Sequence, residues 1–147
     1  MNFERFLTHQ ESDYKGRYLK DIWGFSDEEI ERHHNFIQLI FPLDEPSQAV
    51  FHGLYLDNPK LIESLRSNPE VSKNILKSAD WYFGFLSRND HWITRINHNH
   101  LRITRTIKCL RLLVSNKAAD SFLEAICSLI PDIEIINDSS LNHWHKA

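Results

Sequence analysis

Side chains capable of acid–base chemistry cluster in one short stretch, Glu31 to Gln38. On an α-helix, Glu31, His34 and Gln38 are three and four positions apart, so they can touch one another. Histidine changes charge near neutral pH, so His34 could act on a ligand while Glu31 orients it. The same side chains could instead form a buried polar network that satisfies its own hydrogen bonds. Structural use of such groups is commoner, which favours the network.

A second stretch, residues 91–119, contains six lysine and arginine residues and no acidic residue. If a helix ran through residue 95, Arg95, His98, Arg102 and Arg105 would share one face. Such a ridge could bind phosphate, a carboxylate or a nucleic-acid backbone. It could also pair with the acidic residues of segment 27–31 and join two helices. We favour this joint, because arginine makes planar, directional pairs with carboxylates.

Other reactive arrangements receive little support from the sequence. The pairs His33–His34 and His98–His100 lack the four-residue spacing of a helical zinc site. Four scattered glycines cannot build a phosphate-binding loop, and no Gly-x-Ser-x-Gly motif occurs. Neither cysteine adjoins a histidine in the sequence. We therefore predict no metal and no cofactor, and we name no catalytic residue.

Length and composition are those of an ordinary globular domain. The chain has 147 residues, 41% of them hydrophobic and 25% charged. A formal net charge of -3 argues against a nucleic-acid partner. Two cysteines without a paired spacing favour a reducing compartment. No apolar run approaches the roughly 20 residues of a membrane span. We expect a cytoplasmic protein without a transmembrane segment, and leave peripheral membrane contact and oligomeric state open.

Helical signals recur along the chain. Ser26, with Glu29 three residues later, predicts a capping box that starts a central helix. We expect this helix to run from about Asp27 to Phe41, where the following proline stops it. Asn58-Pro59 and Asn68-Pro69 each predict the start of another helix.

Apolar residues spaced three and four apart predict two further long helices, over residues 101–114 and 118–130. With short helices in the first 24 residues, the pattern predicts an all-α, single compact domain of about six helices. Residues 1–136 would form this domain. Residues 137–147 would be a polar C-terminal tail, loose unless Trp144 docks.

The two polar stretches resemble motifs of the conserved domain of the opioid growth factor receptor family. Residues 31–42, Glu-Arg-His-His-Asn-Phe-Ile-Gln-Leu-Ile-Phe-Pro, are similar to the hallmark Glu-x-x-His-Asp-Tyr-Ile-Gln-Trp-Leu-Phe-Pro. Residues 98–106, His-Asn-His-Leu-Arg-Ile-Thr-Arg-Thr, are similar to His-Asn-x-Leu-Arg-Ile-Thr-Arg-Ile. Asn35, Phe36 and Leu39 depart from the Asp, Tyr and Trp of the first hallmark. Weaker matches extend the resemblance over most of residues 3–130. It implies a short, stand-alone member, an α-helical domain of a receptor family for an opioid growth peptide, and no transferable catalytic residue.

We predict a soluble helical binding module with a surface that recognises a peptide or an anionic small molecule. The residues predicted to form this surface are Glu31, His34, Gln38, His98, Arg102 and Arg105. The alternative is an enzyme acting on an anionic small molecule, with His34 as acid or base and the arginines as an anion clamp. Both hypotheses require the two motifs to meet. At least one of the two arginines should then lie close to Glu31 or to the edge formed by His34 and Gln38.

Overall fold

The computed structural model describes residues 1–47 and 53–147, and this part of the chain is helical without any strand. Its elements are α1 (Phe3–Leu7), α2 (Leu19–Trp23), α3 (Asp27–Arg32), α4 (Ile37–Ile40), α5 (Pro59–Ser67), α6 (Pro69–Arg88), α7 (Asn99–Leu113), α8 (Asn116–Ser128), the 3-10 helix η1 (Ile133–Ile135) and α9 (Asp138–Lys146). The predicted all-α domain is confirmed. The helices outnumber the predicted six because α1 to α4 are single short turns of four to six residues. No helix within the described ranges is long and apolar enough to cross a membrane.

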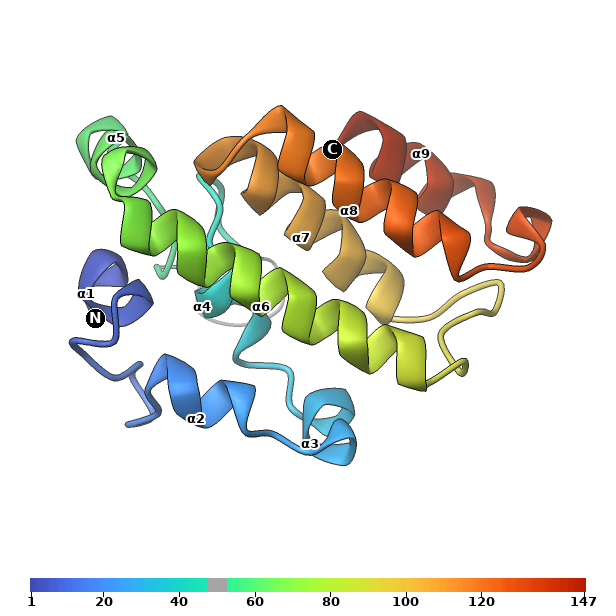
Figure 1. Ribbon diagram of the computed structural model, residues 1–147, viewed down its shortest axis with the longest axis horizontal. Helices are drawn as coiled ribbons and strands as arrows, with labels where there is room; N and C mark the ends of the chain where they lie inside the picture. Colours follow the sequence, from blue (N-terminus) through green and yellow to red (C-terminus); the bar gives the residue numbers. More distant parts are fainter. Residues whose placement is uncertain (48–52) are drawn as a thin grey trace.

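The long helix α6 crosses the middle of the molecule in Figure 1, with α1 to α3 on one side and α7 to α9 on the other. One apolar core runs between these groups and includes the fully buried Phe6, Phe36, Tyr82 and Trp92. Helix α7 packs along α8 and also contacts α5, α6 and α9. Ten of its fifteen residues are buried, so α7 is the central helix of this half of the core.

Local signals place the first residue of several helices where the sequence predicts it. The Ser26 hydroxyl accepts a hydrogen bond from the amide of Glu29, and the Glu29 carboxylate accepts one from the amide of Ser26. The side chains of Asn58 and Asn68 cap α5 and α6, each followed by a proline at the first helical position. These groups satisfy amides that have no partner inside their own helices.

The predicted single helix from Asp27 to Phe41 is wrong, because residues 33–36 separate α3 from α4. His33 ends α3 with extended backbone angles (φ -78°, ψ 134°). In an unbroken helix the carbonyl oxygens of Ile30 and His33 would accept bonds from amides four residues later. They accept instead from the Arg102 guanidinium of α7, at 2.8 and 2.6 Å. A side chain about seventy positions away therefore replaces the helical hydrogen bonds, and no local pattern reveals it.

The C-terminal residues, predicted to be loose unless Trp144 docks, form α9 with that tryptophan docked. Trp144 is fully buried, and its Nε1 donates to the carbonyl oxygen of His100 at 3.0 Å. The two rings meet edge to face, with their centroids 5.7 Å apart. Docking of this one large side chain holds the polar segment against the fold and stabilises its helix.

Candidate functional site

The two polar stretches meet, as predicted. They do so at the break between α3 and α4, which the sequence does not predict. Arg105 donates from Nε to the carbonyl oxygen of Phe41 at 2.9 Å, and from Nη2 to that of Gln38 at 3.4 Å. Arg102 binds the carbonyls at the end of α3. The favoured pairing of these arginines with carboxylates is wrong, since both guanidiniums bind main-chain oxygens. Carbonyls at helix C-termini lack helical partners and carry partial negative charge, so a cation is stabilising there.

Neither arginine has a counter-ion in the described chain. Within residues 1–47 and 53–147, no carboxylate oxygen lies within 4.0 Å of either guanidinium. Arg102 is only 5% exposed, and Arg105 is partly buried. Burial lowers the pKa of both side chains, yet arginine stays protonated in proteins. Main-chain carbonyl dipoles therefore stabilise both positive charges at contact distance, and the Phe36 ring adds a cation–π contact to Arg102.

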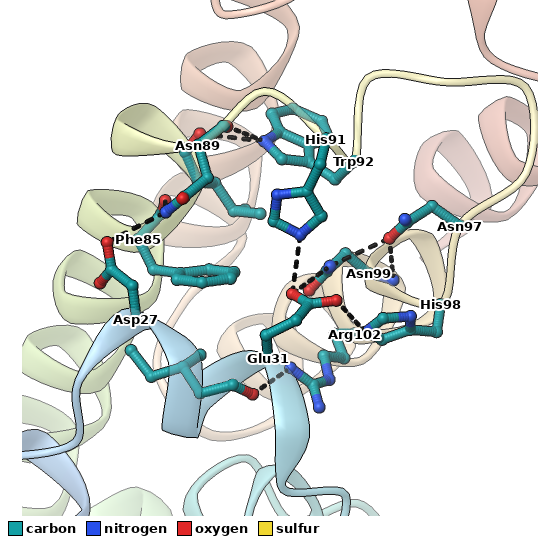
Figure 2. Close-up of polar contacts among 12 residues, drawn as sticks. Asp27, Glu31, Phe85, Asn89, His91, Trp92, Asn97, His98, Asn99 and Arg102 are labelled. Carbon is teal, nitrogen blue, oxygen red and sulfur yellow. Dashed lines mark hydrogen bonds and ion pairs between the residues drawn. The ribbon is translucent and has the colours of Figure 1, made fainter.

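Glu31 binds two histidines, and neither of them is His34. Its Oε1 lies 2.7 Å from Nε2 of His98, and its Oε2 lies 2.8 Å from Nε2 of His91 (Figure 2). Asn99 also donates to Oε2, at 3.2 Å. Burial opposes ionisation of Glu31, but the hydrogen bonds from His91 and Asn99 outweigh it and lower the pKa of the carboxyl. The expectation that Glu31 orients His34 is wrong, because Glu31 orients His98.

His98 links this cluster to the rest of the site. Its ring contacts the ring of His34 edge to face, with centroids 5.5 Å apart. Burial lowers the pKa of His98, while the Glu31 carboxylate acts in the opposite direction. Gln38 donates to the carbonyl oxygen of His34 at 3.1 Å, so the predicted polar edge is held by main-chain contacts.

A pocket of about 660 Å³ opens between α4, the segment that follows it and α7. The arginine, lysine and histidine residues that line it are His34, His98, Arg102, Arg105, Lys108 and His143. Its apolar lining residues are Ile37, Leu43, Pro46 and Leu101, and the remaining ones are Gln38, Glu45, Ser47 and Thr104. Five of the six residues predicted for the recognition surface thus line one pocket. The sixth, Glu31, holds His98 in place.

Sequence reasoning missed several of the pocket residues. Lys108 follows Arg105 by three positions on α7, so helical spacing could have included it. Glu45 accepts a hydrogen bond from Lys108 at 3.2 Å, and nothing in its local sequence indicates that contact. His143 reaches the pocket from α9, the segment that the sequence leaves as a tail.

Two features of the sequence lie outside the pocket. Arg95 precedes α7 and does not share its face. The prediction that Arg95 belongs to the basic ridge is therefore wrong. The backbone carbonyl of Arg95 accepts from Asn137 and helps to hold the start of α9. Cys109 is buried, and burial raises the pKa of its thiol to about 12, so it is not a reactive nucleophile.

The fold and the pocket define a class: an all-helical domain whose long helix presents basic side chains to a broken neighbouring helix. The chain belongs to the opioid growth factor receptor family, since residues 2–145 match the family described as "Opioid growth factor receptor (OGFr) conserved region". It is similar to the opioid growth factor receptors of Mus musculus, Rattus norvegicus and Homo sapiens, with 29%, 28% and 27% identity over 116 residues.

These matches cover 65% of this chain but only 18%, 20% and 17% of the respective relatives. The chain therefore corresponds to about a fifth of the length of each receptor. No solved structure matches the chain.

Proposed function

We propose that this chain is a binding module that recognises an anionic group of a peptide or small-molecule ligand in the pocket between α4 and α7. The supporting observation is the positive charge on Arg102 and Arg105, which no carboxylate of the described chain pairs with. Lys108 adds a third basic side chain, whereas Glu45 is the one acid among the described lining residues. A carboxylate or phosphate of a ligand would supply the missing counter-charge and accept charge-assisted hydrogen bonds.

The similar proteins support a recognition role, because they are named as receptors for an opioid growth factor. This chain shares with them one domain, so we propose a ligand-recognising domain and not the activity of a whole receptor. We also propose a cytoplasmic location, because Cys109 and Cys127 are both unpaired thiols. The enzyme alternative loses its main support, since Glu31 does not hold His34.

The proposal is tested by titrating the protein with inorganic phosphate and with citrate, using calorimetry. Both anions should bind, and Arg105→Gln and Lys108→Gln should each weaken binding about tenfold, since a hydrogen bond to a charged group is worth ~1.5–3 kcal/mol. Arg5→Gln is the matched control, because Arg5 is exposed on α1 and does not line the pocket.

Thermal melts of each variant confirm that it is folded before binding is compared. Equal anion binding by the wild type, Arg105→Gln and Lys108→Gln would contradict the proposal, as would the absence of binding to the wild-type protein.

A further inference from the structure

An acidic segment of the chain forms one wall of the pocket. Residues 43–47, Leu-Asp-Glu-Pro-Ser, follow α4, and four of the five line the pocket. Leu43 is only 4% exposed and belongs to the apolar core, while Glu45 pairs with Lys108. One short segment thus presents a buried apolar side chain and, two positions later, a carboxylate to a lysine of the pocket.

We infer that the ligand is a peptide segment in which a carboxylate side chain adjoins a large apolar one, and that its carboxylate displaces Glu45 from Lys108. The inference rests on the proposed function, because it uses the same anion site. In the absence of a ligand, Glu45 is the carboxylate that pairs with Lys108.

Displacement of Glu45 is feasible because its ion pair is exposed. The side chains of Lys108 and Glu45 are 41% and 58% exposed, and exposed pairs contribute little to stability. Glu45 does not reach Arg105, which has no carboxylate of the described chain within 4.0 Å. An incoming carboxylate could contact both cations, so it competes with an internal partner that contacts only Lys108.

The exposed side chain of Leu101 indicates that the ligand carries an apolar group. This leucine is 71% exposed although it lies in the first turn of α7 and lines the pocket with the buried Ile37 and Leu43. An apolar side chain packed on Leu101 would remove it from water, whereas an inorganic anion or a nucleic-acid backbone would not. Exposed apolar surface beside unpaired basic charge therefore favours an acidic, apolar-flanked peptide.

The test uses an N-acetylated, C-amidated peptide with the sequence Leu-Asp-Glu-Pro-Ser, so that only side-chain carboxylates carry charge. Two further peptides replace the leucine by serine, or both acids by their amides. Binding is measured by calorimetry to the wild type, Glu45→Gln and Leu101→Ser. Glu124→Gln and Leu76→Ser serve as matched controls, because both residues are exposed on other helices and line no part of the pocket.

The parent peptide should bind, and Glu45→Gln should tighten its binding up to about fivefold, the upper range for an exposed ion pair. Leu101→Ser should weaken binding of the parent peptide but not of the serine peptide. The amide peptide should not bind, and the two control variants should behave as the wild type does.

The inference is overturned if Glu45→Gln leaves peptide affinity unchanged, if the serine peptide binds as well as the parent, or if neither the wild type nor Glu45→Gln binds the parent peptide. Phosphate titration separates this failure from failure of the proposed function. If Arg105→Gln weakens phosphate binding but peptides show no discrimination, the anion site stands and the ligand class is wrong. If phosphate also fails to bind, both proposals are wrong.

Discussion

Nη2 of Arg102 lies 2.6 Å from the carbonyl oxygen of His33. Nη1 of the same side chain donates to the carbonyl of Ile30, and the guanidinium carbon lies 5.4 Å from the centroid of the Phe36 ring. One side chain of α7 therefore contacts the end of α3 and the segment that leads into α4. The pocket depends on this joint, because the break places His34 and Gln38 along its wall.

Arg102→Ala should lower the free energy of unfolding by roughly 3 kcal/mol, because it leaves the buried carbonyl of Ile30 and the partly buried carbonyl of His33 unpaired and a cavity beside Phe36. Chemical denaturation followed by circular dichroism measures the loss. Arg32→Ala is the control, since the Arg32 side chain is 64% exposed and forms only a surface ion pair. A loss below about 1 kcal/mol for Arg102→Ala would show that the joint is not structural.

His100 should make the fold less stable at mildly acidic pH. Its Nε2 donates to the carbonyl of Trp92 at 2.8 Å, so the neutral ring presents Nδ1 to the Ser140 hydroxyl at 3.3 Å. Burial lowers the pKa of His100, with the Trp92 hydrogen bond opposing. As pH falls through the unfolded-state pKa, the unfolded chain gains a proton that the folded chain does not, so the free energy of unfolding decreases.

The measurement is the free energy of unfolding from about pH 7.5 to about pH 5.5. His100→Gln should show a shallower decrease than the wild type, and His145→Gln, which removes an exposed histidine of α9, should retain most of the wild-type slope. Parallel curves for wild type and His100→Gln would contradict the assignment.

Trp144→Ala should release α9. The substitution removes a fully buried ring and its hydrogen bond to His100, which corresponds to a loss of about 3–5 kcal/mol. Hydrogen exchange should show lost protection over residues 138–146. If the rest of the fold keeps its protection, the division at residue 136 is a real cooperative boundary. If all protection is lost together, α9 belongs to the domain.

Chelation should leave the melting temperature unchanged. The described residues contain no group of three or more His, Cys, Asp or Glu side chains arranged to hold a metal ion. A structural metal would supply folding free energy, so its removal would lower the midpoint. Thermal melts before and after dialysis against a chelator make the comparison, and stoichiometric zinc in the purified protein would contradict the prediction.

The parts of the fold that could be predicted are those set by neighbours in the sequence. The capping box at Ser26 and the prolines at Pro59 and Pro69 act within one turn, so their effect is visible in a few residues. The break after α3 depends on Arg102, whose approach is decided by packing of the whole chain. Helical periodicity alone therefore merges α3 and α4 into one helix.

The same distinction applies to the site. His34 and Gln38 could be selected because helical spacing and titration chemistry single them out, and Arg105 because it belongs to a basic ridge. Of the two histidines that bind Glu31, His98 belongs to the surface predicted from the sequence. His91 could not be selected, since it lies in the connection between α6 and α7 and has no sequence relation to α3. The pocket residue His143 likewise depends on docking of Trp144.

The guanidiniums of Arg102 and Arg105 bind main-chain oxygens, and every amino acid supplies such an oxygen whatever its side chain. The hallmark stretch can therefore change its side chains without removing the acceptors that join it to α7. Asn35 and Leu39, which differ from the hallmark, stand within this stretch and leave its three acceptors in place, the carbonyls of His33, Gln38 and Phe41. Side-chain substitutions should therefore cost little on the acceptor side of the joint and more at Arg102 and Arg105, since lysine cannot reproduce the forked donors of arginine.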